Sequence, residues 1–197
     1  MSKFRHSLGN KKINFLKSLS FLFSKLALYF IGLFFKLDKK KSEIIISSSF
    51  HAPWKEDLEF LNFYTKIKND TLLDVKRLYT LWYLSKSLKN VNASILDIGC
   101  CKGGSGFALG KANTKGFTFL IDTFEGPKIK ENLISKDHYI FDDVNYVEKK
   151  IKFLKLNNTK VIKTFFPKKL TAKFKKRKIK LCHIDVNTTK ATKLAFE

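Results

Sequence analysis

Short apolar runs alternate with segments of helical pattern over the second half of the chain, and this alternation restricts the fold more than any other feature. The apolar runs occupy 94–99, 116–124, 159–166 and 179–186. Runs of this length, rich in β-branched and aromatic residues and separated by helical segments, predict parallel strands joined by helices. The expected fold class is therefore α/β, with a Rossmann-like, mostly parallel sheet.

Two helical segments are expected before the first strand. The segment 51–67 opens with Pro53, and its apolar residues then recur at roughly helical spacing. The segment 70–88 also has one apolar face, and Asp70 is expected to cap its start. At 197 residues, the chain has room for one domain with an appendage. We predict three regions, which are an N-terminal extension at 1–45, a helical cap or substrate region at 46–94, and a Rossmann-like domain at 95–197.

The N-terminal extension is apolar and has lysines on both flanks. Its longest uninterrupted apolar stretch, LALYFIGLFF at 26–35, is shorter than the roughly 20 residues that a membrane-spanning helix needs. Three interpretations stay open. The extension is a helix that packs on the domain or forms a homo-oligomer, an interfacial helix whose lysines at 11–41 contact anionic lipid, or a weakly inserted single span. Residues 43–50 are expected to form a short strand or an extended linker.

The charge and the cysteines narrow the classes of partner and compartment. The net charge is +22, but it comes almost entirely from lysines spread along the chain, and Arg5, Arg77 and Arg177 are the three arginines. Because base recognition favours the planar fork of arginine, no specific nucleic-acid binding is expected. A basic protein that binds a membrane surface or nucleic acid through its lysines is an alternative. The 3 cysteines form no CxxC pair, which favours a reducing cytoplasm.

The sequence ILDIGCCKGGSGFALG at 95–110 concentrates five of the 9 glycines behind an apolar run. Glycines in such a position indicate a tight turn that lets a ligand approach the backbone. Ligands of open α/β sheets bind beyond the carboxyl ends of the strands, where Asp97, Asp122 and Asp185 are all expected at one rim. A dinucleotide site needs G-x-G-x-x-G, but Cys101 replaces its middle glycine. An acid followed by glycines at two-residue steps suits S-adenosylmethionine better, and Asp122 is then expected to bind the ribose hydroxyls.

Four blocks of sequence carry a resemblance to a known family. They are PWKEDLEF, ILDIGCCKGGSGFALG, FLIDTFEGP and LCHIDVNTTKATKLAFE, and they follow in this order over about 53–197. Together they resemble the macrocin O-methyltransferase family, which consists of class I methyltransferases that use S-adenosylmethionine and a divalent metal. The resemblance implies transfer of a methyl group to a hydroxyl of a sugar or another natural product. Mg²⁺ is the expected metal, because it prefers oxygen ligands.

The glycine turn and the second strand supply the expected cofactor-binding residues. Backbone at Gly99 and Gly103 would wrap the methionine end of the cofactor. Asp97 would lie near the ammonium group, and Asp122, with Thr123 beside it, would hold the ribose. The free amides at the start of the following helix would accept the methionine carboxylate. They belong to Gly104 and Ser105.

Catalysis is expected at the end of the fourth strand. His183 and Asp185 lie two residues apart on a strand and should therefore share a face. Removing the proton of the acceptor hydroxyl makes its oxygen a better nucleophile, and a carboxylate or a bound cation supplies this. By resemblance, Asp185 is the expected metal ligand and a candidate base, and His183 is the second candidate catalytic residue.

Two features depart from the family. Asn187 stands where the family commonly places a second acid, and the sequence ends at Glu197, before the last strands of a seven-stranded methyltransferase sheet. The expected sheet is therefore incomplete at its C-terminal side. An inactive, truncated methyltransferase remnant stays open as an alternative to an active enzyme.

Overall fold

The computed structural model describes residues 18–19, 22–27, 29–30, 52–126, 143–166, 177–186 and 188–196. By its contacts, the chain divides into two compact units, Met1–Ala52 and Pro53–Glu197. The described residues between 18 and 30 in the first unit are helical, and several of their large apolar side chains are exposed. The expected strand or linker at 43–50 and most of the segment 11–41 lie outside the described residues. Within the described part, no helix is long and apolar enough to cross a membrane.

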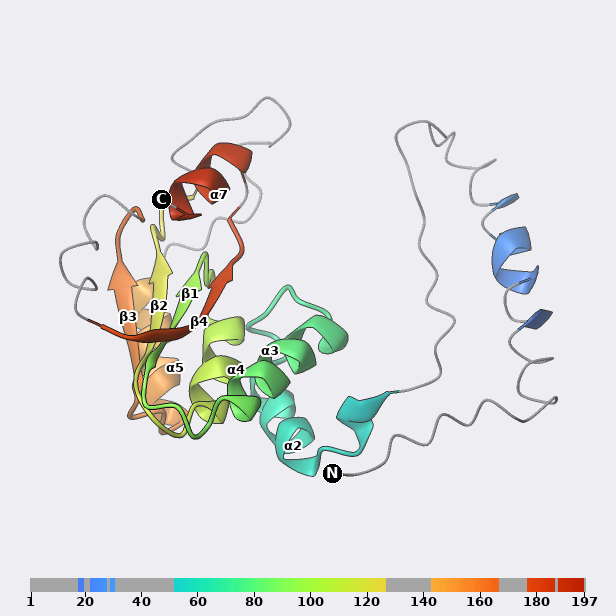
Figure 1. The fold of residues 1–197 in the computed structure, drawn as a ribbon. Helices are drawn as coiled ribbons and strands as arrows, with labels where there is room; N and C mark the ends of the chain where they lie inside the picture. Colours follow the sequence, from blue (N-terminus) through green and yellow to red (C-terminus); the bar gives the residue numbers. More distant parts are fainter. Residues whose placement is uncertain are drawn as a thin grey trace. The chain divides into compact units, whose positions relative to one another are not determined.

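The second unit is built on a parallel sheet of four strands, which confirms the predicted α/β fold (Figure 1). The strands lie in the order β3-β2-β1-β4. The register places Asp97 of β1 beside Leu120 of β2 and His183 of β4. Each predicted apolar run contains one strand, but the strands are shorter than the runs. Their bounds are β1 Ser94–Ile98, β2 Thr118–Asp122, β3 Thr159–Lys163 and β4 Ile179–Ile184.

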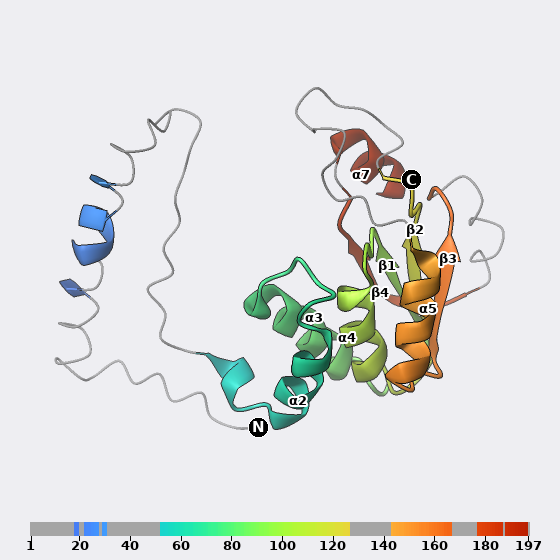
Figure 2. The same ribbon diagram turned by 180° about the vertical axis from the view of Figure 1, so that it is seen from behind.

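Helices α4 (Gly104–Ala112) and α5 (Val144–Phe153) pack on one face of the sheet, as the view from behind shows (Figure 2). Asp143 fixes the start of α5, because its carboxylate accepts the Tyr146 amide at 2.9 Å. Helix α7 (Thr189–Phe196) lies at the carboxyl ends of the strands (Figure 1). The other face of the sheet carries a second apolar cluster. Its buried members are Leu96, Ile98, Phe119 and Ile121.

Three helical elements precede the sheet, namely η1 (Pro53–Lys55), α2 (Leu58–Ile67) and α3 (Val75–Ser87). Asp57 fixes the start of α2, because its carboxylate accepts the Phe60 amide at 2.9 Å and the indole N–H of Trp82 at 3.1 Å. Phe60, Trp82 and Phe107 are fully buried and belong to one core that joins α2, α3 and α4. The predicted cap and substrate region is therefore packed against the first helix of the sheet domain.

The expected capping role of Asp70 is wrong. Helix α3 begins at Val75, and Asp74 caps it by accepting the amides of Lys76 and Arg77 at 2.9 and 3.0 Å. Asp70 is instead buried, with 3% of its surface exposed, in the connection between α2 and α3. Both residues are aspartates next to an apolar helical pattern, so local sequence alone does not separate the exposed cap from the buried acid.

Lys180 closes the opposite end of the sheet, where the strands begin. Its ammonium group donates to three backbone carbonyls that belong to different connections. These bonds join β4 to the end of α3 and to the turn before β2. The acceptors are Leu88, Val91 and Lys115, at 3.1, 2.9 and 3.0 Å.

Candidate functional site

A cavity of about 310 Å³ opens at the carboxyl ends of the strands. This is the edge of an open α/β sheet at which ligands bind, and the volume is at the lower end of the range for small-molecule sites. Its lining comes from the ends of all four strands, from the connection between α2 and α3, from the first turn of α3, and from α7. Among the lining residues are Leu72, Leu73, Arg77, Gly99, Cys101, Asp122, Thr123, Phe165, Phe166, Asp185 and Thr188.

Asp122 lies at the end of β2 and lines this cavity. One carboxylate oxygen accepts the backbone N–H of Cys101 at 2.8 Å, and the other accepts that of Phe124 at 3.0 Å. The neighbouring Thr123 hydroxyl donates to the Gly126 carbonyl at 2.9 Å and so closes the turn after the strand. Asp122 therefore holds both loops at this edge in place. Because each carboxylate oxygen has two acceptor sites, Asp122 retains capacity for a ligand's hydroxyl groups.

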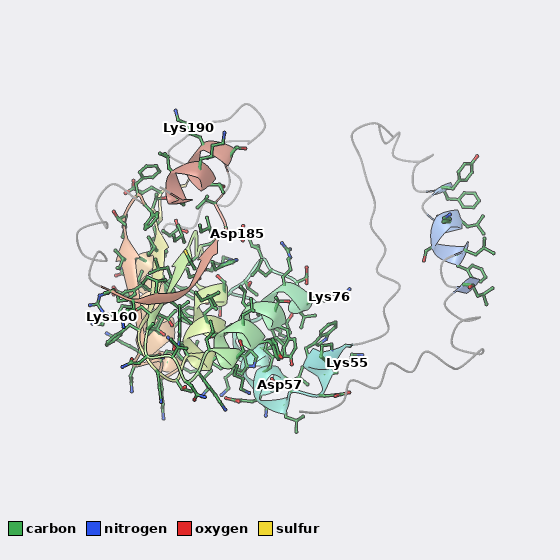
Figure 3. The ribbon with its side chains drawn as sticks, in the orientation of Figure 1. Lys55, Asp57, Lys76, Lys160, Asp185 and Lys190 are labelled. Atoms are coloured by element: carbon green, nitrogen blue, oxygen red, sulfur yellow. The ribbon has the colours of Figure 1, made fainter. Side chains whose placement is uncertain are left out.

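The position after β1 requires glycine for two reasons, the backbone conformation of Gly99 and the close approach of Asp185. Its φ is +88°, and a Cβ atom at this position would lie 2.1 Å from the carbonyl oxygen of Asp185. The Asp185 amide in turn donates to the Ile98 carbonyl at 2.8 Å. A glycine therefore lets the connections after β1 and β4 approach each other closely. As a result, Gly99 and Asp185 line the same cavity, and Figure 3 shows Asp185 on the connection from β4 to α7.

Asp97, Ser105 and His183 form a buried cluster that is not part of the cavity lining. Asp97 has no exposed surface and accepts the Ser105 hydroxyl at 2.8 Å. Its second oxygen lies 2.6 Å from Nδ1 of His183. Burial lowers the pKa of His183, but the hydrogen bond to Asp97 and the charges of Asp97 and Asp185 outweigh this effect, so the pKa is raised overall. The imidazole thus bonds Asp97 and, unlike Asp185, does not line the cavity.

The start of α4 is also separate from the cavity. Gly103 caps the helix in a left-handed conformation, with φ +92°. The amide of Gly104 donates to the backbone carbonyl of Asp70 at 3.0 Å, and a Cβ atom at Gly104 would lie 2.5 Å from the same oxygen. One of the two predicted amide donors for a methionine carboxylate, that of Gly104, is therefore already bonded within the protein, and neither Gly104 nor Ser105 lines the cavity. Of the expected cofactor-binding residues, the structure brings Gly99, Asp122 and Thr123 to the cavity.

A buried ionic network holds the connection between α2 and α3 against α5. The Tyr146 hydroxyl donates to one oxygen of Asp70, and the ammonium group of Lys150 lies 2.9 Å from the other. The hydrogen bond to Asp70 and burial raise the pKa of Tyr146 to about 12. This connection carries Leu72 and Leu73 into the cavity lining. Asp70 thus positions one wall of the cavity without lining it.

Several lining residues were not identified from the sequence. Leu72 and Leu73 resemble part of an apolar helix face, and Phe165 and Phe166 resemble the end of a strand. Cys101 was noted as a departure from the dinucleotide pattern, but not as a cavity residue. It adopts φ +50°, and burial raises the pKa of its thiol. The positive φ of Cys101 marks it as part of the turn that lines the cavity, but the backbone conformation of a non-glycine residue cannot be read from the sequence.

Asp185, just after β4, is the expected ligand of a magnesium ion. Over the ranges that the structure covers, no group of three or more His, Cys, Asp or Glu side chains comes together to hold a metal ion. Asp185 lines the cavity, but the neighbouring Asn187 lies outside the described residues. The expected role of Asp185 as a metal ligand therefore stays a prediction.

Comparison of the chain with protein-family models finds no match, and comparison with curated protein sequences finds no significant match.

Proposed function

We propose that the cavity binds S-adenosylmethionine and that the protein transfers its methyl group to a hydroxyl of a small-molecule acceptor. The observation that carries this proposal is the position of Asp122. Its carboxylate lines the cavity from the end of the second strand and also holds the turn that follows the first. Such a carboxylate suits the two hydroxyl groups of a ribose. Gly99 beside it gives the ligand access to the backbone.

The charge of the cavity favours a sulfonium nucleoside over a dinucleotide. Asp122 and Asp185 both line it, and their carboxylates would repel a pyrophosphate. The same carboxylates attract the sulfonium and ammonium groups of S-adenosylmethionine. Cys101 also places a side chain in the lining at the position where a dinucleotide fingerprint has glycine. A phosphate could not approach the backbone there as closely as the dinucleotide motif requires.

Asp185 is the residue best placed to take up a proton. The cofactor, when bound, supplies a methyl group that is activated by its positively charged sulfur. A carboxylate at the cavity can accept the proton of an acceptor hydroxyl as its oxygen attacks that methyl group. His183 was the other expected catalytic residue, but its Nδ1 bonds Asp97 and it does not line the cavity. We therefore propose that Asp185 accepts the proton of the acceptor hydroxyl. His183 would instead hold the Asp97 carboxylate in position through their hydrogen bond.

Titration calorimetry with S-adenosylmethionine and S-adenosylhomocysteine tests the proposal. The folded wild-type protein should bind both nucleosides. Asp122→Ala should weaken binding by at least about tenfold, since hydrogen bonds to a charged group contribute about 1.5–3 kcal/mol. Asp143→Ala is the matched control, because Asp143 is an exposed acid that caps α5 away from the cavity. Absence of binding to the folded wild-type protein would refute the proposed function.

The Asp122 experiment needs a check on folding, because this carboxylate also accepts two backbone N–H groups. Asp122→Asn keeps one acceptor oxygen at the same place and should bind with intermediate affinity. Circular dichroism at the titration temperature establishes that each variant is folded. Transfer of a labelled methyl group to hydroxyl compounds, assayed with and without Mg²⁺, then separates an active enzyme from an inactive remnant that only binds the cofactor.

A further inference from the structure

The proposed cofactor has a carboxylate for which the structure requires a new partner. The expected donor was the start of α4, but the Gly104 amide is bonded to the Asp70 carbonyl at 3.0 Å. Ser105 directs its hydroxyl to Asp97 and is buried. Neither residue lines the cavity. A carboxylate in a cavity that already holds Asp122 and Asp185 needs a compensating positive charge.

Arg77 supplies such a charge in the cavity lining. It lies in the first turn of α3, and its Nε donates to an oxygen of Asp74 at 2.9 Å. The backbone and side-chain hydrogen bonds from Arg77 lower the pKa of Asp74, which therefore stays ionised and keeps hold of the guanidinium. Asp74 thus fixes Arg77 through one nitrogen. No ion pair among the described residues joins Arg77 to Asp122 or Asp185, so the terminal amino groups are not used by the carboxylates of the cavity.

The choice of arginine at this position is informative in a chain of this composition. Only 3 of the 39 basic residues are arginines. Lysine is the ordinary surface cation of this protein, whereas the planar fork of arginine matches the two oxygens of a carboxylate. The cavity volume of about 310 Å³ suits one nucleoside-sized ligand. An anion at Arg77 and a diol at Asp122 would therefore belong to the same molecule.

We infer that Arg77 binds the carboxylate of the amino-acid end of the cofactor. This inference rests on the proposed function, because it assigns one end of the ligand whose ribose Asp122 would hold. It adds a cofactor-binding residue that lies outside the glycine turn and outside the strands. It also gives the connection between α2 and α3 a functional role, since Asp70 holds this connection against α5 and Asp74 caps α3 and bonds Arg77.

A comparison of two nucleosides tests the inference. S-adenosylhomocysteine has the amino-acid end, whereas 5′-methylthioadenosine has the same adenosine and sulfur without it. In Arg77→Gln, titration calorimetry should show binding of S-adenosylhomocysteine weakened about 10-fold, the lower limit for a charge-assisted hydrogen bond at a side chain that is 64% exposed. The affinity for 5′-methylthioadenosine should change less than about 2-fold, because this nucleoside has no carboxylate for Arg77 to bind.

Two further variants sharpen the test. Lys76→Gln removes the same charge from the same turn of α3 (Figure 3), at an exposed residue that does not line the cavity, and should leave both affinities unchanged. Arg77→Lys keeps the charge but loses the fork and should recover part of the affinity for S-adenosylhomocysteine.

The outcomes separate the inference from the proposed function. If the folded wild-type protein binds neither nucleoside, both fail. If it binds both and Arg77→Gln weakens them equally or not at all, the inference is overturned and the proposed function survives. Loss of discrimination between the two nucleosides in Arg77→Gln alone would support the inference.

Discussion

Replacing Tyr146 with phenylalanine removes one hydrogen-bond donor to the buried carboxylate of Asp70. The ion pair between Asp70 and Lys150 is left in place. Asp70 is 3% exposed, so water does not readily replace the lost donor. Lys150 stays within 2.9 Å of the other oxygen and continues to balance the charge. The expected loss is therefore that of one charge-assisted hydrogen bond. It should not approach the larger cost of an unpaired buried charge.

The magnitude follows from these contacts. A hydrogen bond to a charged group contributes about 1.5–3 kcal/mol, and we expect Tyr146→Phe to reduce the free energy of unfolding by about 2 kcal/mol. Lys150→Met leaves the carboxylate without its counter-ion. Removing one partner of a buried pair costs about 3–5 kcal/mol, and we expect the lower limit because the Lys150 side chain is 21% exposed. Urea unfolding followed by circular dichroism measures both changes.

Tyr83→Phe is the matched control, because Tyr83 is 61% exposed. Its free energy of unfolding should change by less than about 0.5 kcal/mol. The pKa of Tyr146, about 12, gives a second readout by ultraviolet titration, in which the last tyrosine to ionise in the wild-type protein should be missing from Tyr146→Phe. If Tyr146→Phe unfolds at the same urea concentration as Tyr83→Phe, the buried network does not stabilise the fold and the reasoning is wrong.

Three further predictions each concern a single residue. NMR titration should give His183 a pKa above 6.5, and this pKa should fall in Asp97→Asn. Because the folded-state pKa is raised, the stabilisation of the fold by protonated His183 is complete below pH 6.5 and is lost as the pH rises through the folded-state pKa. Lys180→Met should reduce the free energy of unfolding in urea by about 1–2 kcal/mol, because three carbonyls lose a donor, while Lys178→Met at an exposed site should not. Cys101→Gly should raise stability by about 0.5–1 kcal/mol in thermal unfolding, because it relieves a φ of +50°; an unchanged melting temperature would contradict this.

The parallel sheet could be predicted because its strands are local patterns. Each is a short apolar run, and such runs form strands where helical segments separate them. Asp97, Asp122 and Asp185 were expected at one edge for a related reason, and two of them, Asp122 and Asp185, line the cavity. The carboxyl ends of parallel strands meet there, so position along the strand is enough to bring these two residues to one cavity.

The wall that faces these strand ends could not be predicted, because it depends on a contact between distant segments. The Asp70 carbonyl and the Gly104 amide are 34 positions apart in sequence and meet at 3.0 Å. No periodicity encodes that bond, yet it helps to place Leu72, Leu73 and Arg77 at the cavity. An arginine three residues into an amphipathic helix looks like an ordinary exposed residue until the helix start is known.

Asp97 shows why an acid at a strand end is not by itself a ligand-binding group. In the sheet register it lies beside Leu120 and His183, one residue before the strand ends, and therefore points toward the helices that cover this face. Buried carboxylates need partners, and Ser105 and His183 provide them. Asp122, as the last residue of its strand, has its partners in the loops and reaches the cavity. Asp122 lies two positions beyond Leu120, the register partner of Asp97, so these two positions separate an acid that is covered by α4 from one that reaches the cavity. The Asp97→Asn and Asp122→Asn variants should accordingly differ in kind, the first lowering the pKa of His183 and the second lowering nucleoside affinity.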